Sequence, residues 1–233
     1  MERSIVIPAW NEERRLGPTL RHVLDWIAQD GVSTEVIVVD DGSRDATIQI
    51  ARDHGVTVLP LAFHRGKGAA VRAGMWAATG ERVLFCDADL STPIEELPRL
   101  EAELAAGADV AIASRAAAGA RIERRQPVWR EGLGRVFNRY MRAVTALDEW
   151  QDTQCGFKLF TRPAVVQLFS QSFLDGFAFD VELLLRARAM GLRVAEVPVT
   201  WRDDPDSRVG LVRGAPRMAW DVLRLRWNRV GGG

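Results

Sequence analysis

Two carboxylates stand at the end of an apolar segment of the chain. Asp87 and Asp89 are separated by one residue and directly follow Cys86. Carboxylate oxygens suit hard cations such as Mg²⁺ and Mn²⁺, and an ion held by two side chains keeps positions open for the phosphates of a nucleotide diphosphate. The pair therefore indicates a metal-dependent transferase. The alternative is that both aspartates only form a turn after the strand, where Asp is common.

Short apolar segments alternate with stretches of helical length along the chain. The predicted strands cover residues 5–7, 36–39, 56–59, 83–85, 110–113 and 194–199. The predicted helices cover residues 16–28, 46–54, 69–78, 95–106, 129–147 and 181–190. Continuous apolar strands suit a mostly parallel sheet that is covered on both faces. The alternation predicts an α/β fold with helices flanking this sheet.

Polar residues follow four of the predicted strands, at residues 8–12, 40–43, 87–89 and 114–115. In open α/β sheets, ligands bind outside the carboxyl ends of the strands, where loops and helix N-termini converge. We therefore predict that these four segments contribute to one site.

The composition excludes several classes of protein. Lys plus Arg and Asp plus Glu both number 31, so the net charge is zero and no nucleic-acid partner is expected. Cys86 and Cys155 follow no metal-ligand spacing, and a buried, reduced thiol at Cys86 fits a cytoplasmic location. No run of about 18 apolar residues occurs, so no membrane span is predicted.

Six short motifs occur in a fixed order. They are Pro-Ala-Trp-Asn-Glu at 8–12, Asp-Asp-Gly-Ser at 40–43, Arg-Gly-Lys-Gly at 65–68, Asp-Ala-Asp at 87–89, Asp-Thr-Gln-Cys-Gly-Phe-Lys at 152–158 and Phe-Asp-Val-Glu at 179–182. This ordered set resembles family 2 glycosyltransferases of the GT-A fold. Within that family the chain most resembles the dolichyl-phosphate β-glucosyltransferase and polyprenyl-phosphate hexosyltransferase branch, over about residues 4–209.

The resemblance implies a single GT-A domain over residues 1–230. Residues 1–115 would bind the nucleotide sugar, residues 116–230 would shape the acceptor side, and 231–233 would be a flexible tail. It implies a nucleotide-sugar site made of Pro8, Asn11, Glu12, Asp40, Asp41, Arg65, Lys67, Asp87, Ala88, Asp89, Gln154 and Lys158. Asp87 and Asp89 would hold Mg²⁺ or Mn²⁺.

The residue types permit these roles. Carboxylates such as Asp40 accept hydrogen bonds from ring N–H groups and ribose hydroxyls. Residues 65–68 open the third predicted helix, so free amides and two cations are expected to face an anion there. The structural alternatives are a turn at 41–43 with Asp45 capping the next helix, and a basic turn at 65–68.

The resemblance also implies a reaction. An inverting transfer would move a hexose from UDP-glucose, or from GDP-mannose, to a polyprenyl or dolichyl phosphate. The expected catalytic residues are Asp89, Arg115, Asp152, Asp180 and Arg208. A phosphate acceptor is already anionic near pH 7, so Arg115 and Arg208 would position it without a base. A soluble hydroxyl acceptor is the alternative, and it would need a base, for which Asp180 is the first candidate.

Two further expectations concern partners. Residues 216–230 mix Trp220, Trp227 and other apolar residues with four arginines, which is typical of a helix at an anionic lipid surface. A C-terminal helix packed on the domain is the alternative. Many relatives have Asn where His64 stands, and many add transmembrane helices that are not predicted here. A non-catalytic nucleotide-sugar-binding protein is a further alternative, which both metal-site aspartates disfavour.

Overall fold

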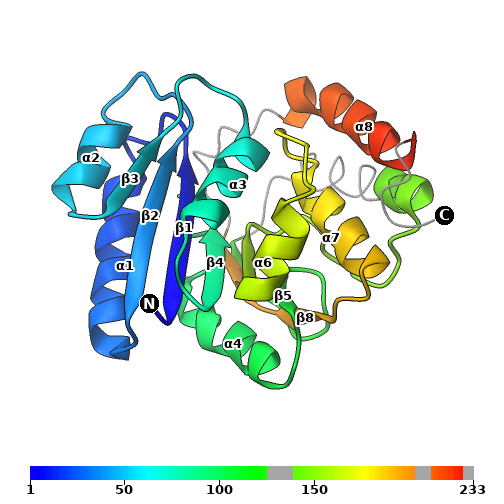
Figure 1. The fold of residues 1–233 in the computed structure, drawn as a ribbon, viewed down its shortest axis with the longest axis horizontal. Coiled ribbons are helices and arrows are strands. Elements are labelled where there is room, and N and C mark those ends of the chain that lie inside the picture. The colour runs from blue at the N-terminus through cyan, green and yellow to red at the C-terminus, as the bar shows by residue number, and fades with distance from the viewer. Residues whose placement is uncertain (125–138, 203–210, 228–233) are drawn as a thin grey trace.

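The computed structural model describes residues 1–124, 139–202 and 211–227, and its centre is a seven-stranded sheet (Figure 1). The strand order is β3-β2-β1-β4-β7-β5-β8. These strands are β1 (Arg3–Ala9), β2 (Thr34–Asp40), β3 (Thr57–Pro60), β4 (Arg82–Cys86), β5 (Val110–Ser114), β7 (Phe157–Thr161) and β8 (Val194–Pro198). All paired strands of this sheet are parallel except β7, which runs antiparallel to both β4 and β5.

Helices cover both faces of the sheet. They are α1 (Leu16–Asp30), α2 (Thr47–Asp53), α3 (Lys67–Ala77), α4 (Leu97–Ala105), α6 (Arg162–Phe169), α7 (Phe179–Ala189) and α8 (Leu211–Trp227), with a short 3₁₀ turn, η1 (Ile94–Glu96), before α4. A second sheet of two parallel strands joins β6 (Arg121–Arg124) to β9 (Thr200–Arg202).

The core has two parts, one on each face of the sheet. In β1, Ile5 and Ile7 belong to the cluster that includes residues of α1, α2 and α4, whereas Val6 between them belongs to the cluster that includes residues of α3, α6, α7 and α8. The side chains of a strand alternate between its two faces, so a strand that is apolar throughout must be covered twice. The predicted α/β fold with a mostly parallel, doubly covered sheet is therefore confirmed.

The predicted elements differ from the structure in several places. Helix α3 begins at Lys67, two residues before the predicted start, so Lys67 and Gly68 lie in its first turn. Strand β7 and helix α6 were not predicted, because Lys158 interrupts the apolar pattern of β7. Residues 139–145 are helical, within the predicted 129–147, and residues 129–138 lie outside the described residues.

Two further expectations can be compared with the described residues. Within them, no helix is both long enough and apolar enough to cross a bilayer. Cys86 and Cys155 are free and buried, and burial raises the pKa of the Cys155 thiol to about 11. Both thiols are therefore protonated at neutral pH, as expected for buried structural cysteines.

Candidate functional site

The sheet brings four of the sequence motifs to one edge. The parallel strands β1, β2 and β4 end together at Ala9, Asp40 and Cys86. Strand β7 runs the other way, so it begins at this edge, with Phe157 opposite Cys86. Because β7 is antiparallel, residues 152–156 reach the same edge as the loops that follow β1, β2 and β4.

The carboxylate pair lies directly after β4. The Oδ1 atom of Asp87 is 2.5 Å from the Nζ atom of Lys67, at the start of α3. Asp89 Oδ1 accepts a hydrogen bond of 2.9 Å from the Ser91 amide, and its Oδ2 atom is 3.8 Å from Arg15 Nη1. Burial, followed by the negative charge of Asp87, raises the pKa of Asp89. The protein surroundings of Asp89 therefore disfavour its charged form.

The residues present fit a divalent cation. The two aspartates offer hard oxygen ligands, and a cation would offset the burial and repulsion that raise the pKa of Asp89. Within the described residues, no group of three or more His, Cys, Asp or Glu side chains is placed to hold a metal. A cation here would thus be completed by oxygens of the substrate or water, as is common for Mg²⁺.

Gly156 makes room for this arrangement. An added Cβ at Gly156 would overlap the carboxylate carbon and both oxygens of Asp87. The Gly156 carbonyl also accepts a hydrogen bond of 3.0 Å from the Asp87 amide. The glycine thus holds the Asp87 backbone and leaves the space for its carboxylate.

The loop after β1 is tied to the loop after β2. Asn11, which has a positive φ of 55°, accepts a hydrogen bond of 2.9 Å from the Arg44 amide. The Glu12 amide donates to Thr47 Oγ1, and the Glu12 carboxylate pairs with Arg15, which approaches Asp89. These contacts link the first motif to the carboxylate pair through Arg15.

Two other predicted residues complete this side of the site. Pro8 is partly buried in β1. Ala88 is buried between the two aspartates, and its carbonyl accepts a hydrogen bond of 2.6 Å from Thr19 Oγ1 of α1. The contact with α1 fixes the backbone between Asp87 and Asp89.

Asp40 and Asp41 are both buried and hold loops in place. Asp40 Oδ2 accepts hydrogen bonds from the Gly42 and Ser43 amides, which is the turn weighed as the structural alternative. Its Oδ1 atom is buried and has no hydrogen-bond partner among the described residues. Asp41 accepts hydrogen bonds of 2.8 Å from the Arg65 and Gly66 amides. Asp40 therefore keeps an unused buried acceptor at the sheet edge.

The Arg65 and Gly66 amides are not free to face a bound anion, contrary to the expectation for residues 65–68. The Arg65 and Gly66 amides donate to Asp41, and the Arg65 side chain pairs with Asp175 at 3.0 Å. An added Cβ at Gly66 or Gly68 would overlap the backbone carbonyls of residues 174–176. Both glycines therefore allow the backbone of residues 174–176 to pack closely against them. Lys67 still faces the carboxylate pair.

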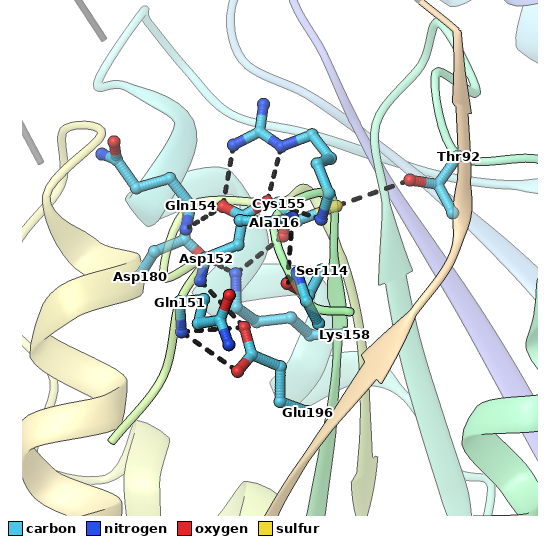
Figure 2. Close-up of polar contacts among 12 residues, drawn as sticks. Thr92, Ser114, Ala116, Gln151, Asp152, Gln154, Cys155, Lys158, Asp180 and Glu196 are labelled. Carbon is cyan, nitrogen blue, oxygen red and sulfur yellow. Dashed lines mark hydrogen bonds and ion pairs between the residues drawn. The ribbon is translucent and has the colours of Figure 1, made fainter. Parts of the chain in front are cut away.

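A second cluster joins β5, β7 and β8 (Figure 2). Asp152 is buried and bonded twice by the Arg115 guanidinium, at 2.6 Å from Nε and 2.8 Å from Nη2, and once by the Arg115 amide. Glu196 on β8 accepts hydrogen bonds from the Gln151 and Asp152 amides. The two hydrogen bonds from the Arg115 guanidinium to Asp152 fix the plane of that guanidinium at the end of β5.

The Asp152 carboxyl group makes a testable contribution to acid stability. Burial alone would raise its pKa, but the Arg115 charge and hydrogen bonds lower it to about 2. An acid with a depressed folded-state pKa stabilises the fold above its unfolded pKa, and this stabilisation is lost as the pH falls from about 4 to about 2. The free energy of unfolding in urea would be measured across this pH range. For the wild type it should fall by about 2–3 kcal/mol more than for Asp152→Asn. Parallel pH profiles for the two proteins would contradict the prediction.

Lys158 and Asp180 form a buried ion pair within reach of this cluster (Figure 2). Lys158 Nζ donates to Asp180 Oδ1 at 2.6 Å and to the Cys155 carbonyl at 2.7 Å. Both side chains are almost fully buried, and burial raises the pKa of Asp180 although Lys158 and Lys67 oppose the shift. Asp180 is thus buried and paired with Lys158. A carboxylate in this position does not suit the role of a base that faces an acceptor.

Of the remaining predicted residues, Gln154 is described by the structure and Arg208 is not. Gln154 lies beside the Asp152 cluster, and its Nε2 atom is 4.0 Å from Met218 Sδ of α8. Arg208 lies outside the described residues, so its predicted phosphate contact stays a prediction. The structure therefore brings Asp87, Asp89 and Lys67 together at one place, and Arg115 and Asp152 at a second.

Sequence reasoning missed three residues that shape the site. Gly156 lies within the fifth motif, directly before a strand, where a glycine is a signal of close backbone approach. Arg15 bridges Glu12 and Asp89 from the start of α1, and Glu196 fixes the backbone at Asp152. Neither charged residue lies in a motif, so no signal in the single sequence distinguishes it from a surface charge.

Comparisons with known proteins show the family of this chain. Residues 4–169 match the model of the family described as glycosyl transferase family 2. The dolichyl-phosphate beta-glucosyltransferase of Drosophila melanogaster is 39% identical over 247 aligned positions, covering 98% of this chain and 75% of the relative. The Homo sapiens protein of the same name is 33% identical and covers 98% of this chain and 76% of the relative.

Solved structures agree on the fold. Glucosyl-3-phosphoglycerate synthase from Mycobacterium tuberculosis, in complex with Mn²⁺, uridine-diphosphate-glucose and phosphoglyceric acid, superposes with a TM-score of 0.75 at 22% identity. The match covers 99% of this chain and 80% of that one. The GT-A fold and the family resemblance predicted from the six motifs are confirmed. The chain belongs to glycosyl transferase family 2 and is a glycosyltransferase.

Proposed function

We propose that this protein transfers glucose from UDP-glucose to a polyprenyl or dolichyl phosphate, with inversion at the anomeric carbon. The names of the relatives support the glucose and the lipid phosphate. The observation that carries the proposal is the Asp87 and Asp89 pair, which lies at the sheet edge beside Lys67, with the charged form of Asp89 disfavoured by its protein surroundings. GDP-mannose is the second candidate donor, because its sugar differs from glucose at one hydroxyl.

Asp87 and Asp89 would hold Mg²⁺ or Mn²⁺ together with the diphosphate of the donor. The ion would supply charge stabilisation to the departing nucleoside diphosphate. Lys67 Nζ adds a fixed positive charge at the same place, 2.5 Å from Asp87 Oδ1. The Gly156 backbone keeps the Asp87 carboxylate in position through its hydrogen bond to the Asp87 amide.

Asp40 would read the base of the nucleotide. Its buried Oδ1 atom has no partner among the described residues, and a carboxylate oxygen suits the ring N–H of uracil or guanine. In Asp40→Asn, one amide oxygen can still accept from Gly42 and Ser43, but an NH₂ group replaces the free acceptor. We expect UDP to bind at least about tenfold more weakly, as measured by calorimetry, with little change in melting temperature. Unchanged UDP affinity would contradict the base-reading role.

The acceptor side suits a phosphate better than a hydroxyl. A phosphate oxygen needs no deprotonation near pH 7, and arginine matches phosphate geometry. Asp152 occupies two of the N–H directions of Arg115, and a guanidinium has five N–H donors in total. The other donors of Arg115 suit the acceptor phosphate. A hydroxyl acceptor would need a base, and Asp180 is buried against Lys158.

A transfer assay tests the function. The protein would be incubated with labelled UDP-glucose or GDP-mannose, Mg²⁺ or Mn²⁺, and a short polyprenyl phosphate, and label would be counted in the organic extract. We expect metal-dependent transfer from UDP-glucose that falls at least about 100-fold in Asp89→Asn, because one of the two proposed metal ligands loses its charge.

Asp53→Asn is the matched control, because Asp53 is exposed on α2 away from the sheet edge. It should retain full activity. Donor binding without label in the organic phase would overturn the lipid-phosphate acceptor. Full activity of Asp89→Asn would overturn the assignment of the metal site.

A further inference from the structure

Helix α8 has apolar side chains on two opposite faces. Val222 and Leu225 are fully buried in the core. Trp220, Leu223 and Trp227 are 59%, 42% and 84% exposed, which is unusual for such large apolar groups. Their spacing of three and four residues places them on one side of the helix. The outward side of α8 therefore presents a continuous apolar stripe.

Positive charge flanks this stripe. Arg217, Arg224 and Arg226 are exposed on the same helix. Within residues 217–227, the part of α8 whose side chains the structure describes, Asp221 is the one acidic residue, and it is buried. Two exposed tryptophans between exposed arginines match the chemistry of an anionic lipid surface. Tryptophan settles at the level of the headgroups, and each arginine near such a surface adds electrostatic attraction.

The helix also borders the acceptor side of the site. Met218 Sδ of α8 is 4.0 Å from Nε2 of Gln154, two residues from Asp152. Tyr140 donates a hydrogen bond of 3.0 Å to the Ala219 carbonyl, which fastens α8 to the helix at 139–145. In the view of Figure 1, α8 and the start of α3, which is at Lys67, both lie in the upper part of the molecule. A lipid surface bound to α8 would thus lie beside the acceptor side of the site.

We propose that the outward side of α8, formed by Trp220, Leu223 and Trp227 with Arg217, Arg224 and Arg226, docks on an anionic lipid bilayer. The docked helix presents the acceptor side of the site to the headgroup layer, where the phosphate of a polyprenyl phosphate lies. The inference about orientation rests on the proposed lipid acceptor, whereas the docking itself rests on the surface of α8.

Vesicle binding tests the docking. The protein would be sedimented with vesicles of phosphatidylcholine alone or with about 30% phosphatidylglycerol. We expect the wild type to bind the anionic vesicles at least about tenfold more tightly, and tryptophan emission to shift to the blue on binding. The double variant Trp220→Ser/Trp227→Ser should lose at least about tenfold in affinity. Trp76→Ser, which removes an exposed tryptophan of α3, is the matched control and should bind normally.

Two assays separate the docking from the function. On a short, water-soluble prenyl phosphate, Trp220→Ser/Trp227→Ser should be as active as the wild type, whereas on long-chain acceptor in anionic vesicles it should lose at least about tenfold. If the wild type binds neither kind of vesicle but transfers sugar to the short acceptor, the docking is wrong and the proposed function is supported. Vesicle binding without transfer to either acceptor would overturn the function alone. Self-association that the double variant abolishes, without vesicle binding, would assign the stripe to a second copy of the chain.

Discussion

Replacing Gly156 with alanine is expected to reduce glycosyl transfer at least about 100-fold while the protein stays folded. The added methyl group would occupy the position of the Asp87 carboxylate. That carboxylate is about one-third exposed, so it can rotate toward solvent without disturbing the core. The rotation would separate Asp87 from Lys67 and from Asp89. The expected loss is therefore in metal-dependent donor binding and turnover, and not in stability.

Gly17→Ala is the matched control for this substitution. An added Cβ at Gly17 meets its nearest neighbour at 3.6 Å, which is ordinary van der Waals contact, and alanine is favoured in a helix. Label transfer, Mn²⁺-dependent UDP binding and melting temperature would be measured for both variants. A Gly156→Ala protein with wild-type Mn²⁺-dependent UDP binding would show that Asp87 does not need its present position.

Breaking the buried pair of Lys158 and Asp180 is expected to destabilise the fold by about 3–5 kcal/mol. In Asp180→Leu the Lys158 ammonium group keeps the Cys155 carbonyl but loses its counter-charge inside the core. In Lys158→Met the Asp180 carboxyl group, whose pKa burial already raises, is left without its closest cation. A group with a raised folded-state pKa binds its proton more tightly when folded, so the Lys158→Met protein should lose stability as the pH rises above about 4.

The double variant Lys158→Met/Asp180→Leu tests whether the pair acts as a unit. With both charges removed, stability in urea should return to within about 1–2 kcal/mol of the wild type, because apolar groups can replace a buried ion pair. If Asp180→Asn instead keeps wild-type stability and loses transfer to a hydroxyl acceptor, Asp180 is a base and the structural role of the pair is wrong.

The sequence predicts the fold well where signals are local. The apolar strands from Ile5 to Ala113 and the polar residues at their ends are visible in order, so the sheet edge and the Asp87 and Asp89 pair could be located. Strand β7 could not, because a lysine as the second residue of a five-residue strand indicates a surface position. Lys158 is buried only because Asp180, 22 residues later, pairs with it.

The details of the site depend on tertiary contacts that spacing does not reveal. Gly66 and Gly68 read as ligand-facing glycines, yet residues 174–176 fill the space beside them. Arg115 reads as a free phosphate-binding cation, yet Asp152, 37 residues later, takes two of its donors. In both cases the residue type indicates which groups could bind there. A partner from elsewhere in the chain determines which group is bound. The nucleotide-sugar, metal and acceptor roles of the individual residues stay predictions.

The antiparallel strand β7 has a consequence for how the chain is completed during synthesis. Strands β3, β2, β1 and β4 neighbour each other and can pair once residue 86 has left the ribosome. Strand β5 emerges next but has no partner in the sheet until β7 and then β8 follow. Until then β4 has an open edge, which is prone to non-native pairing. Because Gly156 directly precedes β7, a nascent chain cannot assemble its carboxylate site before residues 116–156 of the acceptor side have been translated.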